Sequence, residues 1–406
     1  MRLLIADKLH TRAVEELRTL PIEVVYEPEL TKDTLESRMP GVGILVVRSK
    51  EVTAKAIESA RQLNLIVRAG AEVNTIDVRA ASKGGVYVAN CPGKNAVAVA
   101  ELAMGLLVAM DRRIPDAVAS LRAKKWERGE YSKAEGLAGK SIGIAGLGAT
   151  GREVAMCAKG FGLHPIAWSR GLTPARAAEL GVGFARTMDE LAQKSDILTL
   201  HLPVTERTHH IVDKRVLDLL PKKAMLINVA RADLVDYGAL RDAVQRRGLR
   251  AAVDVYPDEP KGRGEFDSDL FGGPSPTGGF IYGTPHIAAS TDQAQLAIAT
   301  ETVRVIRSFL VDGTVPNCVN ISHARAARFQ LVIRMLDKIG TLANVLAVIK
   351  RHGINIEEVT NTVFEGGEAS STKLRLLSRP SEACLTEIRA FDEILHLDLV
   401  TLPNLA

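Results

Sequence analysis

The segment Gly146-Leu-Gly148-Ala-Thr-Gly151 carries three glycines in the spacing GxGxxG. It follows a predicted strand over 141–145 and precedes a predicted helix over 152–159, and this context makes the motif specific. The first glycine permits a tight turn, the second lets a pyrophosphate approach the backbone, and the third lets helix and strand pack closely. The phosphates would then lie at the helix N-terminus. We therefore predict a dinucleotide site formed by Gly146, Leu147, Gly148, Ala149, Thr150 and Gly151.

The next predicted strand, over 165–168, ends without the acidic residue that usually holds the ribose hydroxyls of NAD. Ser169 occupies the expected place of that acid, and Arg170 follows it. A hydroxyl and a guanidinium would suit a ribose phosphate better than bare hydroxyls. Alternatively, Arg170 points to solvent and the site discriminates weakly. The predicted cofactor is therefore NAD or NADP, and these two residues favour acceptance of NADP.

Polar residues follow three further apolar runs, at the points where strands are predicted to end. Arg231, Glu259 and His286 each lie in such a polar segment. An open α/β sheet binds its ligands beyond the carboxyl ends of its parallel strands. Each segment alone is equally compatible with a helix cap, a turn or a surface histidine. The assignment of a function to these residues must therefore rest on their order and context.

Two blocks of short apolar runs, which alternate with helix-like stretches, would position these residues. The first block extends over 3–88 and the second over 141–255, and a long apolar helix over 96–110 joins them. This alternation predicts two parallel sheets with helices on both faces. The segment Lys261–Gly279 is rich in glycine and proline, which predicts a mobile loop. After Val319 the predicted order is βαββαβ, a ferredoxin-like unit.

The bulk composition is that of an ordinary globular protein. The chain has 406 residues, of which 25% are charged, and a formal net charge of +4. This mild charge does not argue for nucleic acid but is compatible with an anionic small substrate. The four cysteines are scattered without a metal-type spacing, which predicts reduced thiols, a cytoplasmic location and no metal site. The most apolar stretch is too short for a membrane span, so no membrane association is expected.

The motifs resemble those of the D-isomer-specific 2-hydroxyacid dehydrogenases, from Arg48 to about Val319. The resemblance implies two Rossmann-like, doubly wound domains. A flavodoxin-like substrate domain would comprise 1–95 and 290–320, and an NAD(P)-binding domain, 96–289, would be inserted into it, with the active site in the cleft. Beyond the glycine motif, the implied cofactor residues are Ser169, Arg170, His201, Pro203, Val229, Ala230, Arg231, Asp254 and His286.

The resemblance also implies that Arg231, Glu259 and His286 form a triad that oxidises a secondary alcohol by hydride transfer. This reaction needs a base for the hydroxyl proton, and imidazole, which titrates near neutral pH, fits that task. A carboxylate beside the imidazole favours imidazolium and fixes the ring. A planar guanidinium matches a substrate carboxylate and polarises the adjacent carbonyl. Asn228 and Asp254 are expected near the nicotinamide amide.

Arg48-Ser-Lys50 and Arg68-Ala-Gly70 look like the segments that the 3-phosphoglycerate dehydrogenases of this family place around their substrate. The implied substrate is 3-phosphoglycerate, because a carboxylate and a phosphate together need more cations than one arginine provides. The sequence departs from the family at Glu72-Val-Asn-Thr75, where many members have Gly-Val-Asp-Asn. The predicted substrate residues are Arg48, Lys50, Arg68, Ala69, Gly70 and Asn95.

The C-terminal unit, 328–406, resembles an ACT domain, a module that commonly binds amino acids. A dehydrogenase followed by this module is the arrangement of the enzymes at the head of serine synthesis. L-Serine is therefore the expected effector, bound near Asp337 and Asn355 at a seam where edge strands of this domain pair two copies of the chain. The alternative is that the domain serves assembly only. The apolar helix over 96–110 further predicts a homodimer or homotetramer built on the cofactor domain.

Two other functions stay open. A glyoxylate or hydroxypyruvate reductase would use the same machinery but would depend little on Arg48 and Lys50, because its substrate lacks a phosphate. A non-enzymatic corepressor or ligand sensor on the same fold could keep the triad residues. Saturable turnover at a physiological substrate concentration would argue against this last alternative.

Overall fold

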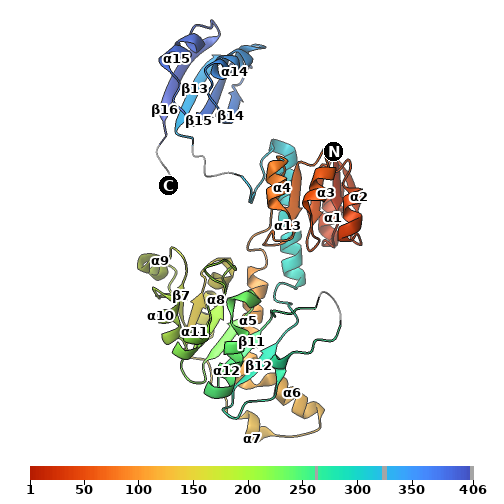
Figure 1. Ribbon diagram of the computed structural model, residues 1–406, viewed down its shortest axis with the longest axis vertical. Helices are drawn as coiled ribbons and strands as arrows, with labels where there is room; N and C mark the ends of the chain where they lie inside the picture. Colours follow the sequence, from red (N-terminus) through yellow and green to blue (C-terminus); the bar gives the residue numbers. More distant parts are fainter. Residues whose placement is uncertain (261–263, 322–326, 403–406) are drawn as a thin grey trace. The chain divides into compact units, whose positions relative to one another are not determined.

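The computed structural model of the chain describes residues 1–260, 264–321 and 327–402. The chain divides into two compact units, Met1–Asn320 and Ile321–Ala406. The first unit contains two parallel β-sheets, and the second contains one antiparallel sheet (Figure 1). The predicted α/β class, with Rossmann-like parallel sheets and a separate C-terminal sheet, is therefore confirmed.

The N-terminal sheet has five parallel strands in the order β2-β1-β3-β4-β5. The strand order reverses between β1 and β3, and such a switch point leaves a crevice for ligands beyond the carboxyl ends of the strands. Strand β3 is buried along its whole length, as expected for an apolar run covered by helices on both faces. The strands are β1 (Arg2–Ile5), β2 (Glu23–Tyr26), β3 (Ile44–Val47), β4 (Leu65–Arg68) and β5 (Tyr87–Ala89).

Helices from distant parts of the sequence cover this sheet. The core on one face combines Leu3 and Ile5 of β1 with Val303 and Ile306 of α13, and the core on the other face contains Leu4. This alternation follows from the opposite directions of successive strand side chains. The first face carries α1 (Thr11–Arg18) and α13 (Asp292–Asp312), and the second α2 (Lys32–Arg38), α3 (Ala54–Ser59) and α4 (Val78–Lys83).

The second sheet has seven parallel strands in the order β12-β11-β10-β9-β6-β7-β8. Its switch point lies between β6 and β9, which places the glycine motif after β6 at the ligand-binding edge. The strands are β6 (Ser141–Ala145), β7 (His164–Trp168), β8 (Gly183–Phe184), β9 (Ile197–Leu200), β10 (Met225–Asn228), β11 (Arg250–Val253) and β12 (Phe280–Gly283).

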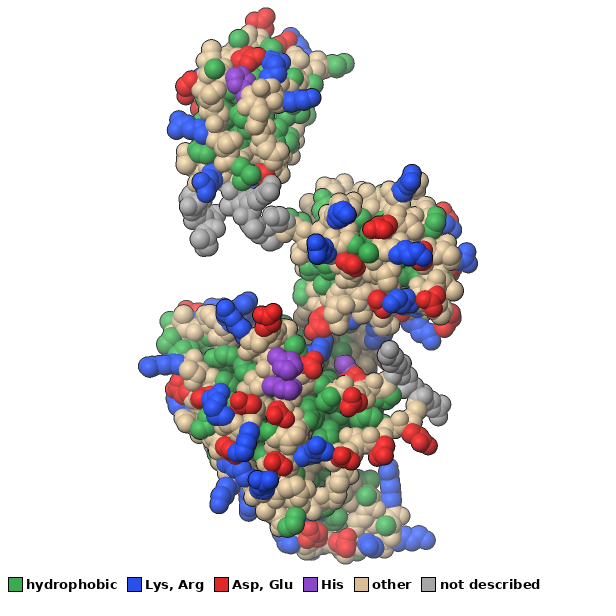
Figure 2. Space-filling model, viewed as in Figure 1, with side chains coloured by type: hydrophobic (Ala, Val, Ile, Leu, Met, Phe, Trp, Pro, Cys, Tyr) green, Lys and Arg blue, Asp and Glu red, His purple; other side chains and the backbone are tan. Residues whose placement is uncertain are grey.

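The long apolar helix α5 (Ala96–Arg112) is mostly buried within its own chain, where it packs on α8, β10 and β11. Among the described residues, no helix is both long and apolar enough to cross a membrane. On the face that Figure 2 shows, acidic and basic side chains are interspersed. The other helices here are α6 (Ile114–Arg122), α7 (Arg128–Tyr131), α8 (Ala149–Gly160), α9 (Pro174–Glu179), α10 (Met188–Gln193), α11 (Lys214–Leu219) and α12 (Tyr237–Arg247), with short 3-10 turns at Ala232–Leu234 and Asp269–Phe271.

Several predicted bounds differ from the observed ones. The helix after the glycine motif begins at Ala149 rather than at 152, because Gly148 is its N-cap residue. The strand predicted over 251–255 ends at Val253, where Asp254 begins a hydrogen-bonded loop. The two-residue strand β8 was not predicted, because such a short pair of residues has no periodicity.

The prediction of a mobile loop at Lys261–Gly279 falls partly on 261–263, which lie outside the described residues. The described remainder is anchored by aromatic contacts. The rings of Phe266 and Phe271 pack edge-on against Tyr256, at centroid distances of 4.9 and 5.8 Å. Further along, the buried Ser275 hydroxyl donates to the carbonyl of Val244 at 3.0 Å.

The C-terminal unit has the predicted βαββαβ order, and its antiparallel sheet is arranged as β14-β15-β13-β16. A single core between the sheet and its two helices contains Ile333, Val345 and Ile388. Strand β14 lies at the edge and is almost wholly exposed. The elements are β13 (Phe329–Leu336), α14 (Thr341–Arg351), β14 (Ile356–Val363), β15 (Ala369–Leu376), α15 (Glu382–Arg389) and β16 (Ile394–Thr401).

Candidate active site

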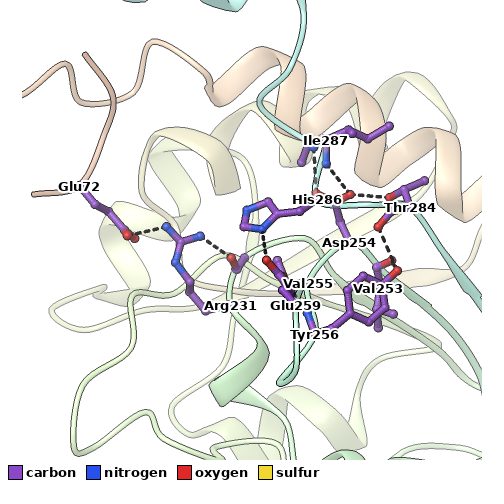
Figure 3. A network of polar contacts seen from close by, with 12 residues as sticks. Glu72, Arg231, Val253, Asp254, Val255, Tyr256, Glu259, Thr284, His286 and Ile287 are labelled. Atoms are coloured by element: carbon purple, nitrogen blue, oxygen red, sulfur yellow. Dashed lines mark hydrogen bonds and ion pairs between the residues drawn. The ribbon is translucent and has the colours of Figure 1, made fainter. Parts of the chain in front are cut away.

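The three predicted triad residues lie at one edge of the second sheet, because each follows one of three neighbouring parallel strands. Arg231 follows β10, Glu259 follows β11 and His286 follows β12. The His286 Nδ1 lies 2.7 Å from the Glu259 Oε2, while the Glu259 Oε1 accepts the backbone N–H of Tyr256 at 2.9 Å (Figure 3). The carboxylate thus fixes the imidazole ring through Nδ1. The other ring nitrogen, Nε2, has no hydrogen-bond partner among the described residues.

His286 is held in the left-handed backbone conformation, with φ of 52°, which a residue with a side chain rarely adopts. The fully buried Asp254 stabilises this loop. Its Oδ1 accepts the N–H of Ile287 at 2.9 Å and the hydroxyl of Thr284 at 2.5 Å, and its Oδ2 accepts the N–H of Ala288 at 2.8 Å. Asp254 therefore positions His286, and the predicted contact of Asp254 with a cofactor stays a prediction.

Arg231 is positioned by the turn that follows β10. The fully buried Asn228 folds this turn, since its Nδ2 donates to the carbonyl of Arg231 at 2.9 Å and its Oδ1 accepts the N–H of Ala230 at 3.2 Å. Asn228 thus holds the arginine in place, and its expected position near the nicotinamide amide stays a prediction. The Arg231 Nη2 lies 2.5 Å from the Oε2 of Glu72, which belongs to the N-terminal sheet region. The sequence marks Glu72 only as a departure from the family pattern.

The N-terminal sheet brings its predicted cations to the carboxyl ends of β3 and β4. Arg48 and Lys50 follow β3, and their loop is held by the buried Asp7, which accepts the N–H groups of Arg48, Ser49 and Lys50 at 2.7, 2.9 and 2.9 Å. The Lys50 Nζ lies 3.3 Å from Asp7 and donates to the carbonyl of Pro28 at 2.7 Å. The Lys50 ammonium is therefore engaged within the sheet, whereas the sequence predicts that it faces the substrate.

Asp7 was missed by sequence reasoning, although an acid just beyond the first strand was the available signal. Burial alone would raise the pKa of Asp7, but the backbone hydrogen bonds from Arg48, Lys50 and Ser49, together with the charge of Lys50, lower it overall. The carboxylate therefore stays ionised and can hold the loop throughout the physiological range.

Arg68 closes β4 and folds over Gly70. A Cβ atom at Gly70 would lie 1.9 Å from the Arg68 Nη1, so a side chain at this position would require the guanidinium to move. Burial lowers the pKa of Arg68, the charge of Glu72 opposes this effect, and Arg231 and Arg48 add to it. These charges therefore act on one another within one cluster. The remaining predicted substrate residues are the buried Ala69 and the partly exposed Asn95, which is the N-cap residue of α5.

The glycine motif has the geometry of a dinucleotide cradle. A Cβ at Gly146 would lie 2.4 Å from the carbonyl oxygen of His201, and one at Gly151 would lie 2.0 Å from that of Gly146. A Cβ at Gly148 would meet nothing within 4 Å, and no side chain caps the N-terminus of α8 there. Gly146 and Gly151 thus allow close packing, and Gly148 leaves open space for a phosphate. The flanking Leu147 is buried, Ala149 is exposed and Thr150 is partly buried.

The other predicted cofactor residues lie at the same edge of the sheet. Ser169 is partly buried, and Arg170 is exposed and makes no hydrogen bond or ion pair with any residue that the structure describes. Burial lowers the pKa of His201 to about 4, so its ring is neutral, and its Nε2 lies 2.9 Å from the hydroxyl of Thr199. Of the rest, Pro203 is exposed, Val229 is buried and Ala230 is partly buried.

The two predicted effector residues lie at opposite ends of the C-terminal sheet. Leu336, next to Asp337, pairs with Ala369 at the start of β15, whereas Ile356, next to Asn355, pairs with Leu376 at its end. At the rise of an antiparallel strand, these ends are roughly 24 Å apart. One copy of the chain therefore cannot form an effector site from both residues, and the predicted site requires a second copy.

Comparisons with known proteins agree with this geometry. Residues 104–288 match the family model of the D-isomer specific 2-hydroxyacid dehydrogenase NAD-binding domain. A D-3-phosphoglycerate dehydrogenase of Methanocaldococcus jannaschii is 34% identical over 93% of this chain and 70% of that protein. A hydroxypyruvate reductase of Thermotoga maritima is 36% identical over 75% of this chain and 97% of that protein.

Among solved structures, the NAD+-bound 3-phosphoglycerate dehydrogenase of Entamoeba histolytica superposes with a TM-score of 0.64 at 25% identity, over 79% of this chain and 99% of that one. The chain spans 58–70% of the length of the curated phosphoglycerate dehydrogenases that it matches. The match to the Thermotoga protein covers nearly all of that relative, and it includes the segments that carry the triad residues and the glycine motif. This chain belongs to the D-isomer-specific 2-hydroxyacid dehydrogenase family.

Proposed function

We propose that this protein is a D-3-phosphoglycerate dehydrogenase, which oxidises 3-phosphoglycerate to 3-phosphohydroxypyruvate in the first step of L-serine biosynthesis. The observation that carries the proposal is the His286–Glu259 pair, 2.7 Å apart, on the sheet edge that also holds Arg231 and the glycine cradle. An acid–base pair beside a dinucleotide cradle suits hydride transfer from an alcohol. The names of the curated relatives point to the same reaction.

The residues of the chain divide the reaction between them. A nicotinamide bound at the cradle would supply the hydride acceptor. The Nε2 of His286 takes the hydroxyl proton, and the Glu259 carboxylate stabilises the imidazolium that forms. Arg231 binds the substrate carboxylate and orients the carbon that is oxidised. Asp254 and Asn228 hold the loops of His286 and Arg231 in place.

A phosphate on the substrate would be bound by the cations of the N-terminal sheet. Arg48 and Arg68 carry this role in the proposal, whereas the Lys50 ammonium is already engaged with Asp7 and Pro28. The engagement of Lys50 favours the second candidate, a glyoxylate or hydroxypyruvate reductase, because such a substrate needs fewer cations. The hydroxypyruvate reductase of Thermotoga maritima is the relative that supports this alternative.

The test is a turnover panel with 3-phosphoglycerate, D-glycerate, glycolate and D-lactate, each with NAD and with NADP. We expect 3-phosphoglycerate to give the highest kcat/KM. Equal or better use of D-glycerate would support the reductase instead. Saturating turnover of none of these acids would leave a non-enzymatic role on the same fold.

The family of this chain uses NAD as its cofactor, and we further propose that this chain accepts NADP. Its support is Arg170, which is exposed at the end of β7 and without a partner among the described residues. A free guanidinium beside a hydroxyl can bind a 2′-phosphate. The alternative is a site that takes NAD and leaves Arg170 in solvent.

The proposed assembly is a homo-oligomer. The burial of α5 within its own chain accounts for its apolar sequence, so α5 no longer supports a dimer by itself. The support comes from α6 and the residues after it, where Ile114, Val118 and Leu121 are exposed at helical spacing and Trp126 is 81% exposed. Apolar groups clustered in this way are typical of a protein interface.

The C-terminal unit is proposed to be an ACT domain that binds an amino acid, L-serine, between two copies. The exposed edge strand β14 offers unpaired backbone groups to a second copy. Such pairing could bring Asp337 of one copy toward Asn355 of the other. If calorimetry with L-serine shows no binding to the oligomer, the domain serves assembly only.

A further inference from the structure

The ion pair between Glu72 and Arg231 joins two parts of the first unit that are far apart in sequence. The Glu72 Oε2 lies 2.5 Å from the Arg231 Nη2, and the two side chains are 36% and 39% exposed (Figure 3). A second guanidinium nitrogen, Nη1, donates to the carbonyl of Ala230 at 2.5 Å. The guanidinium that we assign to the substrate carboxylate is therefore already occupied by a carboxylate of the protein.

A glutamate and a 2-hydroxy acid present the same group to this arginine. Both carry a carboxylate, and the guanidinium can bind it in the same manner. One of its terminal nitrogens is bonded to Glu72 and the other to Ala230. Two carboxylates at the same guanidinium nitrogen repel each other, so a substrate carboxylate that binds Nη2 competes with Glu72.

We propose that Glu72 is an internal competitor of the substrate, which occupies Arg231 in the substrate-free protein and must release it before a 2-hydroxy acid can bind. The inference rests on the proposed function, which assigns the substrate carboxylate to Arg231. Many members of the family carry glycine in the place of Glu72, and a glycine cannot form this pair. The competition is therefore a property of this chain and sets its affinity for substrate.

Glu72 competes in the free protein and takes no part in the transfer of hydride. Its removal should therefore lower KM and leave kcat unchanged, as expected when an interaction differs only between the free and the bound states. A partly exposed ion pair of this kind changes an equilibrium by about two- to fivefold. The gain should be the same for phosphorylated and unphosphorylated acids, because all of them carry the carboxylate that meets Arg231.

The experiment uses the full chain as wild type, Glu72→Gln and Glu72→Ala. Calorimetric titration with oxalate, a carboxylate that cannot be oxidised by hydride transfer, measures binding without turnover. We expect the Kd of oxalate to fall about two- to fivefold in both variants. The matched control is Glu23→Gln, which breaks the exposed pair of Glu23 with Arg2, 3.3 Å apart at the opposite end of the strands, and should not change the Kd.

Weaker oxalate binding in the Glu72 variants would show that Glu72 positions Arg231. Equal oxalate binding in all proteins, or none, would show that the pair has no influence on the carboxylate site. Either result overturns the proposal. Steady-state kinetics with D-glycerate and with 3-phosphoglycerate then separate the two hypotheses. If oxalate binds more tightly in the variants but 3-phosphoglycerate is not oxidised by any of them, the substrate assignment fails and the competition stands.

Discussion

Two buried aspartates have the same task on the two sheets of the first unit. Asp7, just beyond β1, accepts three backbone N–H groups of the loop after β3. Asp254, directly after β11, accepts two backbone N–H groups and a hydroxyl of the loop after β12. In both sheets the carboxylate at the end of one strand holds the loop of a neighbouring strand. Residues that support a site in this way orient the groups that bind or react.

The two aspartates differ in what surrounds their charge. Asp7 lies 3.3 Å from the Lys50 ammonium, whereas Asp254 accepts only neutral donors. The loop of Asp7 carries Arg48, a proposed substrate ligand, and the loop of Asp254 carries His286, the proposed base. The difference suggests that Asp7 acts on substrate affinity and Asp254 on the rate of the chemical step.

The largest expected effect comes from substitution of His286, which lies in the loop that Asp254 holds. His286→Ala should lower kcat by about 10²–10⁴-fold, because it removes the general base. The glycine cradle is separate from the imidazole, so the Kd of the cofactor should change little. Stopped-flow turnover and fluorescence titration with NADH measure the two quantities. Unchanged turnover in this variant would end the assignment of the triad.

The second-largest expected effect comes from substitutions of the two aspartates, which can be compared directly. Asp254→Asn replaces one acceptor oxygen by an NH₂ group, which cannot accept the N–H groups of Ile287 or Ala288, so the His286 loop should shift. A misplacement on the order of 1 Å can lower a rate by about 10²-fold, so we expect kcat to fall about 10–100-fold. Asp7→Asn should instead raise KM when the phosphorylated acid is the substrate. The comparison fails if both variants change the same kinetic constant.

The sequence predicted the parts of this site that depend on local patterns. The glycine motif, the apolar strands and the polar residues after β10, β11 and β12 all lie close to where periodicity and motif order place them. The triad could be proposed because parallel strands end at one edge, so that residues distant in sequence share that edge.

The contacts that sequence reasoning missed are specific to the folded chain. Lys50 was expected to face the substrate, but its partner Asp7 is 43 residues away in the sequence, and no periodicity connects the two. The pair of Glu72 with Arg231 likewise depends on how two loops meet.

A third loop, after β7, lacks an aspartate at the position where an acid would hold the cofactor ribose. Introducing a carboxylate at this position tests its effect on cofactor preference. Ser169→Asp should shift the preference toward NAD roughly tenfold, because a carboxylate binds ribose hydroxyls and repels a 2′-phosphate. Steady-state kcat/KM with NAD and NADP measures this ratio. A wild-type protein that already excludes NADP would show that Arg170 does not contact the cofactor.

The smallest effect concerns the stability that the charge of Asp7 contributes. Its pKa is lowered in the folded protein, so the ionised carboxylate stabilises the fold above the unfolded pKa, near 3.8, and this contribution is lost as the pH falls through the lower folded value. The free energy of unfolding of wild type should therefore exceed that of Asp7→Asn at pH 7. The two values should converge as the pH is lowered below about 4, because protonation removes the same charge as the substitution.

Urea unfolding at a series of pH values measures this convergence, and Asp242→Asn is the control. Asp242 forms an exposed pair with Arg246, 3.4 Å apart, and exposed pairs of this kind contribute little to stability. Its substitution should leave the pH dependence of unfolding as in wild type. If the difference between wild type and Asp7→Asn stays constant from pH 7 to pH 3, the charge of Asp7 does not stabilise the loop. The carboxylate would then act only through the geometry of its hydrogen bonds, as Asp254 does with its neutral donors.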